Sequence, residues 1–174
     1  MDESTVLVLQ IIVQWVHVLS AILWVGGFAL INFMVFPSIP VLPPEQQRRF
    51  GRVLAPKLKT FFSVVSGIVM LFGLIRGTLL GPIKGLDVLF GSSYGLTWLA
   101  ALILTIGLGL IGARVVGPTA ERMYGDDSLW DFGPGQPPPA GLLAHVQLLR
   151  TVGLIESLGF LVVFTLMVLM RFGL

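Results

Sequence analysis

The sequence predicts an all-α fold, a polytopic membrane four-helix bundle with both termini on the outer side. Of its 174 residues, 55% are hydrophobic and only 11% are Asp, Glu, Lys or Arg, whereas a soluble domain carries about 25% charged residues. The mean hydropathy is +0.93. Crossing a hydrocarbon core takes about 20 apolar helical residues. Four stretches meet that length, namely residues 6–36, 60–80, 95–116 and 142–170.

The first stretch, residues 6–36, is expected to be retained as a tilted or projecting helix. Its apolar run is too long for a signal peptide, and Asp2 and Glu3 precede it in place of basic residues. Proline and glycine clusters mark the ends of the stretches, and we expect them at or outside the interface because unpaired backbone groups are costly in lipid. They are Pro37, Pro40, Pro43 and Pro44, then GPIKG, Gly117-Pro118 and GPGQPPPAG.

The basic residues predict the orientation of the bundle in the cell membrane. Eight of them lie in the first loop or around the third, and three lie on the other side. Since cytoplasmic loops carry an excess of Lys and Arg, we expect a multi-pass plasma-membrane protein with its N and C termini outside. The eight are Arg48, Arg49, Arg52, Lys57, Lys59, Arg114, Arg122 and Arg150, and the three are Arg76, Lys84 and Arg171.

The two longer connections differ in character. Residues 45–59 place Phe50, Val53 and Leu54 on one side of a helix and basic residues elsewhere, as an interfacial helix does. Their charge either follows the positive-inside rule on a helical linker or binds anionic lipid. Residues 118–141 are rich in Gly, Pro and acid without long periodicity, which indicates a cytoplasmic loop. The chain, residues 1–174, is therefore expected to be a single transmembrane domain in the lipid bilayer.

Composition excludes several classes of chemistry. The absence of Cys excludes disulfides, thiolate metal sites, Cys nucleophiles and c-type haem. A net charge of +2 is too small to cover a phosphate backbone, so we expect no nucleic-acid partner. No Ser-His-Asp set or carboxylate pair forms within the stretches, which disfavours hydrolysis. Of the two histidines, His145 falls at the inner mouth of the fourth stretch and is expected to be neutral in function.

His17 is the strongest candidate for a functional residue. It lies inside the first stretch, and Gln10, Gln14, Ser20 and Trp24 share its helix face. Ionisable groups inside a bilayer are costly and usually mark pathways or cofactors. A neutral imidazole is a common axial ligand of haem b and a common copper ligand. The alternative is a histidine that hydrogen-bonds a carbonyl or Ser on a neighbouring helix.

Three further side chains could assist His17. Arg76, near the outer end of the second stretch, either snorkels to the interface or binds a haem propionate. Met167 and Met170 lie one helical turn apart at the outer end of the fourth stretch. They either join His17 in a Cu(I) site or serve as apolar filler.

Glu156 is the one acid well inside a stretch. It either belongs to a proton or cation path or pairs with a polar group at the inner end of the bundle. The candidate partners are Arg114, Arg150, Lys59 and Asn32.

The segment from Trp15 to Gly27 resembles the first helix of CopD-like membrane proteins, with their W-x-H-(x)6-W-x-G-G pattern. HemJ-type protoporphyrinogen oxidases have a similar helix, and the segment that starts at Tyr94-Gly95 is similar to the family's Y-G-x-x-L. The resemblance implies a four-helix bundle whose first-helix histidine serves a haem or metal function in the outer half. The family's Lys in the third helix is replaced here by Ala100 and Ala101, which argues against the HemJ reaction.

The sequence thus leads to three functional hypotheses. The first is a haem b protein in electron transfer or haem-linked oxidation, with His17 as axial ligand and Arg76 on a propionate; Gln14, Ser20 and Trp24 complete that site. Its sixth ligand would be Met70 or the His17 of a second copy in a homodimer, and it would need a redox partner protein. The second is a copper transport or homeostasis protein that uses His17, Met167 and Met170. The third is a cofactor-free accessory subunit of a membrane complex.

Overall fold

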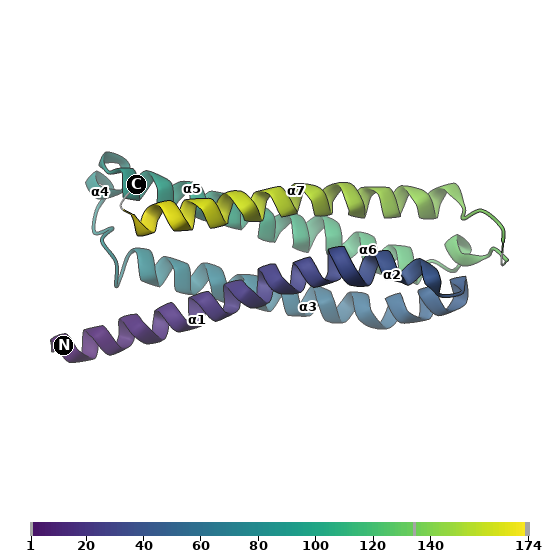
Figure 1. The fold of residues 1–174 in the computed structure, drawn as a ribbon, viewed down its shortest axis with the longest axis horizontal. Coiled ribbons are helices and arrows are strands. Elements are labelled where there is room, and N and C mark those ends of the chain that lie inside the picture. The colour runs from purple at the N-terminus through teal and green to yellow at the C-terminus, as the bar shows by residue number, and fades with distance from the viewer. Residues whose placement is uncertain (1, 134, 173–174) are drawn as a thin grey trace.

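The computed structural model describes residues 2–133 and 135–172, and this part of the chain contains helices and no strand (Figure 1). Four helical segments, each long and apolar enough to cross a membrane, run back and forth along the bundle; they are Glu3–Val41, Pro44–Gly77, Ser93–Gly125 and Ala140–Arg171. The predicted all-α membrane bundle is therefore confirmed. Both chain ends lie at the same end of the bundle (Figure 1), here called the termini end. The opposite end, which holds Arg48 and Arg122, is called the basic end.

The four segments are built from the following elements. The first joins α1 (Glu3–Leu30), a π-helix (Ile31–Val35), α2 (Phe36–Ser38) and a 3₁₀ turn (Ile39–Val41). The second is α3 (Pro44–Gly77), followed by the short α4 (Leu86–Gly91). The third joins α5 (Ser93–Ile111), a π-helix (Gly112–Val116) and α6 (Gly117–Gly125). After a 3₁₀ turn (Asp127–Trp130), α7 (Ala140–Arg171) completes the bundle.

The helices extend well beyond the apolar stretches. Residues 45–59 are helical, as expected, but they form the first part of α3 rather than a separate interfacial helix. The expected loop of residues 118–141 differs more, since residues 117–125 form α6. The reason is tertiary packing, because Met123 and Tyr124 of α6 are buried against α3 and α7.

Three of the prolines that the sequence suggested as helix ends, Pro37, Pro40 and Pro118, lie inside helical segments. Pro37 and Pro118 each follow a π-helical segment, in which the N–H of Phe36 donates to the carbonyl of Ile31 and that of Gly117 to the carbonyl of Gly112. A proline cannot donate to the carbonyl four residues earlier, and its ring clashes with it in a regular α-helix. The wider π turn redirects these carbonyls, so the helix continues past the proline.

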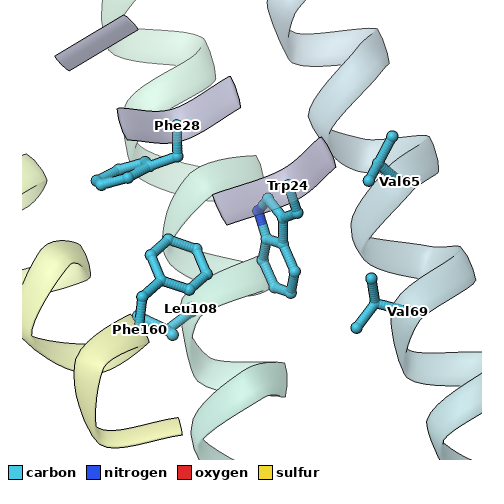
Figure 2. Close-up of a cluster of buried hydrophobic side chains, with 6 residues drawn as sticks. All are labelled: Trp24, Phe28, Val65, Val69, Leu108 and Phe160. Carbon is cyan, nitrogen blue, oxygen red and sulfur yellow. The ribbon is translucent and has the colours of Figure 1, made fainter. Parts of the chain in front are cut away.

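The helices meet at mid-length in the central cluster, which holds Trp24, Phe28, Val65, Val69, Leu108 and Phe160 (Figure 2). The ring of Phe160, on α7, lies 5.1 Å from that of Trp24 in an edge-to-face arrangement and 5.0 Å from that of Phe28. Such aromatic pairs stabilise a fold by more than the burial of their surface area accounts for. The cluster therefore joins α7 to α1.

A second core, the basic-end cluster, lies where the helices extend beyond the apolar stretches. It consists of Ala55, Met123, Tyr124, Leu142 and Leu149. Met123 is only 1% exposed. Trp130 stacks on Tyr124 with ring centroids 5.6 Å apart, and its indole N–H donates to the carbonyl of Met123 over 2.8 Å. This packing fixes the 3₁₀ turn on α6.

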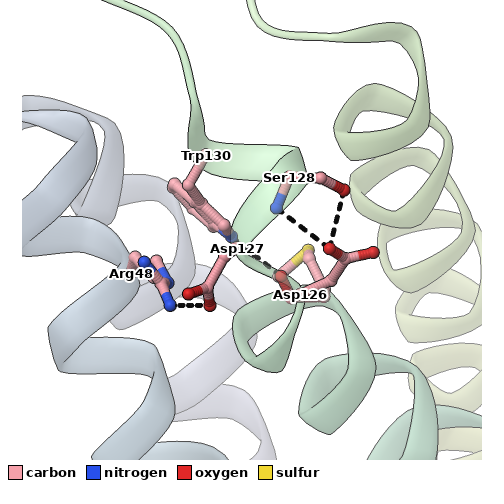
Figure 3. A network of polar contacts seen from close by, with 6 residues as sticks. Arg48, Asp126, Asp127, Ser128 and Trp130 are labelled. Carbon is pink, nitrogen blue, oxygen red and sulfur yellow. Dashed lines mark hydrogen bonds and ion pairs between the residues drawn. The ribbon is translucent and has the colours of Figure 1, made fainter.

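Polar contacts hold the same turn on α3. Figure 3 shows the ion pair between Arg48 and Asp127. The hydroxyl and the backbone N–H of Ser128 both donate to Asp126, and these hydrogen bonds hold the pKa of that carboxyl below its ordinary value. Each contact is exposed, so it contributes more to geometry than to stability.

Candidate functional site

His17 lies in the seam between α1 and α3. Its side chain is buried, and Nδ1 lies 3.0 Å from the carbonyl oxygen of Val69 on α3. A Cβ atom at Gly73, one turn later, would lie 3.0 Å from Cε1 of the imidazole. The glycine therefore lets the ring reach the backbone of α3. One of the alternatives that the sequence offered for His17 was a hydrogen bond to a carbonyl on a neighbouring helix. The contact with Val69 is such a bond.

The other residues predicted around His17 have contacts of their own. The hydroxyl of Ser20 donates to its own helix, at the carbonyl of Val16, over 2.7 Å. Trp24 belongs to the central cluster. Gln14 and Arg76 line a separate cavity of about 480 Å³ at the termini end, and His17 lines neither this cavity nor the one described below.

The predicted methionine ligands lie on two other helices, Met70 on α3 and Met167 and Met170 on α7. Met70 packs against α5, where a Cβ atom at Gly109 would lie 2.5 Å from its Cε. Met167 and Met170 lie near the end of α7, and Figure 1 shows α1 diverging from α7 toward the termini end. The copper site with His17 therefore stays a prediction.

The most promising site is an interhelical cavity between the central cluster and the basic-end cluster. All four helical segments line it. Its volume is about 360 Å³, which lies within the range of about 300–1,000 Å³ typical of small-molecule sites. Most of its walls are apolar, and both π-helical segments contribute to them. Its polar side chains are Asn32, Lys59, Ser63, Ser66, Tyr124, Arg150, Glu156 and Ser157.

Glu156 lines this cavity from α7 and is only 6% exposed. Among residues 2–133 and 135–172, its carboxyl group has no hydrogen-bond or ion-pair partner. A Cβ atom at Gly112, the first residue of a π-helical segment, would lie 3.7 Å from its Oε1. The missing side chain at Gly112 therefore leaves space in front of the carboxyl group.

The expected pairing of Glu156 at the inner end of the bundle is wrong, because the candidate partners are engaged elsewhere or do not reach it. The amide of Asn32 donates to the carbonyl of Phe28 over 3.0 Å. The ammonium of Lys59 donates to Glu121 over 2.8 Å. In the described part of the chain, Arg114 and Arg150 form no ion pair with Glu156 either. The bundle thus buries a carboxyl group without a fixed partner.

Sequence reasoning identified Glu156 but missed the cavity. Ser63 and Ser66 lie three residues apart within the second apolar stretch, and Asn32 lies within the first. Each is an isolated polar residue in lipid-compatible sequence, and the fold brings all three to the walls of one cavity. Their convergence depends on helix rotation and crossing, which a single sequence does not specify.

Comparison with known proteins adds no assignment. Family models, curated proteins and solved structures contain no significant match to this chain. The resemblance to CopD-like and HemJ-type proteins therefore stays a prediction. The function has to be inferred from the chemistry of the side chains.

Proposed function

We propose that the protein is a multi-pass membrane protein that binds a small amphiphilic molecule in the interhelical cavity at Glu156. The observation that carries this proposal is the buried carboxyl group without a partner on the wall of an apolar cavity. Ionisable groups inside a membrane bundle are expensive and usually functional. Ligand sites typically combine apolar walls with a few polar groups that orient the ligand.

The test uses Nile red, a neutral lipophilic dye, with the protein in lipid nanodiscs. We expect saturable binding above that of empty nanodiscs and a loss of at least about tenfold in affinity in Gly112→Leu, which fills the space in front of Glu156. Gly107→Leu is the matched control on the same helix, because nothing lies within 4 Å of a Cβ atom there. Equal binding by both variants, or no saturable binding by the wild type, would refute the proposal.

We further propose that the basic end faces the cytoplasm, from the excess of eight basic residues over three. The chain has no cysteine, so single-cysteine variants report the topology without background. In intact cells we expect a membrane-impermeant maleimide to label Ser4→Cys, at the termini end. Ser128→Cys, at the basic end, should react only after the membrane is permeabilised. The reverse pattern would invert the proposed orientation.

A second candidate is haem b binding at His17, favoured by the contact of Nδ1 with the carbonyl of Val69. When Nδ1 donates this hydrogen bond, Nε2 keeps a lone pair, as in many metal-bound histidines. The imidazole thus fits an axial ligand, whereas the hydroxyl of Ser20 is already bonded to its own helix. A haem held there would supply one-electron transfer.

The haem candidate has a direct spectroscopic test. The purified protein is titrated with haem b, and a Soret band that disappears in His17→Ala but persists in Glu156→Gln would support it. A wild-type protein that gives no Soret band above that of free haem would rule it out. Neither result bears on the binding of Nile red at the interhelical cavity.

A further inference from the structure

The charges of the interhelical cavity identify the class of its ligand. We infer that the cavity selects a lipophilic organic cation, for which Glu156 is the counter-charge. This inference rests on the proposed function, since it specifies the ligand of the same cavity.

The first argument is the distribution of charge around the cavity. Glu156 is the only acidic residue among those that line it. Of the two basic residues, Lys59 is already neutralised by its ion pair with Glu121. Arg150 is exposed and lies six residues before Glu156 on α7, about 9 Å nearer the basic end. The carboxyl group of Glu156 is therefore not compensated by an ion pair, and the guanidinium group of Arg150 belongs to a residue nearer the basic end.

The second argument is the aromatic surface on the same walls. Trp24, Phe28 and Phe62 all line the cavity, and Trp24 and Phe28 are packed in place by Phe160. Aromatic faces attract organic cations through their quadrupoles, most strongly where water is excluded. A carboxyl group together with fixed aromatic rings is a recognition site for a bulky cation.

The donor set favours an organic cation over a metal ion. Calcium takes six to eight oxygen ligands, and magnesium requires near-octahedral coordination. Within the described residues, no group of three or more His, Asp or Glu side chains could hold a metal ion. A single carboxyl group among apolar walls instead suits a cation that carries its own hydrophobic surface.

The experiment compares two probes of nearly the same shape and opposite charge, tetraphenylphosphonium and tetraphenylborate, as competitors of Nile red in nanodiscs. We expect tetraphenylphosphonium to displace the dye from the wild type at a concentration at least about tenfold lower than tetraphenylborate, after subtraction of binding to empty nanodiscs. In Glu156→Gln this preference should fall to near unity, while Nile red still binds. Glu45→Gln is the matched control, because Glu45 is exposed and does not line the cavity, and it should keep the preference.

The possible outcomes separate the two proposals. If Nile red binds but the two ions compete equally, or if Glu156→Gln keeps the preference for the cation, the cavity binds amphiphiles without selecting cations and this inference is overturned. If Nile red itself does not bind saturably, the proposed function fails first. A preference for the cation that is lost only in Glu156→Gln supports both.

Discussion

Replacing Gly51 by alanine is expected to lower the free energy of unfolding by about 1–3 kcal/mol, the usual cost of overpacking a core. A Cβ atom at Gly51 would lie 2.1 Å from Cδ1 and 2.4 Å from Cγ of Tyr124. Rotation of the ring about the Cβ–Cγ bond leaves Cγ in place and cannot relieve the clash. Either the whole Tyr124 side chain leaves its buried position or α3 and α6 separate, and the basic-end cluster loses packing in both cases. Alanine also favours the helix by about 1 kcal/mol, which offsets only part of the cost.

Thermal unfolding in detergent, followed by circular dichroism, measures this effect. A change of 1 kcal/mol shifts the midpoint by about 2–4 °C in a protein of this size. Gly67→Ala is the matched control on the same helix, since Gly67 is exposed and nothing lies within 4 Å of a Cβ atom there. We expect its midpoint to be unchanged or slightly raised. Equal midpoints for the two variants would show that α6 does not pack on α3 at Gly51.

Truncating Phe160 to alanine is expected to have the largest effect in the membrane-spanning part of the bundle. The ring of Phe160 contacts both Trp24 and Phe28, so its removal leaves a cavity where α7 meets α1. Buried Phe→Ala changes in soluble cores cost about 3–5 kcal/mol. Inside a bilayer the transfer from water contributes little and the lost packing remains, so we expect a loss of about 2–3 kcal/mol.

Unfolding by titration with SDS in mixed micelles measures the loss. The control is Phe164→Ala, one turn further along α7, because Phe164 is 67% exposed and faces outward. We expect its stability to lie within about 0.5 kcal/mol of the wild type. If Phe164→Ala is as damaging as Phe160→Ala, then α7 is rotated relative to the arrangement in Figure 2.

Apolar length predicted the bundle well, and local signals predicted the helix ends poorly. Four stretches of lipid-compatible sequence correspond to four long helices, because a spanning segment must satisfy its backbone hydrogen bonds internally. Pro37 and Pro118 looked like breakers, but each is accommodated by a π turn. Whether a helix stops at such a proline depends on the tertiary contacts beyond it, here those of Met123 and Tyr124.

The sequence predicted individual residues of the candidate site but not their arrangement. The burial of His17 and Glu156 followed from their position within apolar stretches. Their surroundings did not follow, because helix rotation places the imidazole in a two-helix seam and the carboxyl group on a cavity. The glycines at positions 73 and 112 create the space for each group, and a glycine in an apolar stretch does not by itself reveal what it accommodates.

The extension of the helices past their apolar stretches means that a single set of helices folds in two solvents. Segments of 32 to 39 residues are about 48–58 Å long, whereas the hydrocarbon core is about 30 Å thick. The central cluster is therefore stabilised by packing in lipid, and the basic-end cluster by the removal of apolar surface from water. Urea and temperature should act mainly on the second core, and acyl-chain length and lateral pressure on the first. Since the interhelical cavity lies between the two cores, its shape depends on both.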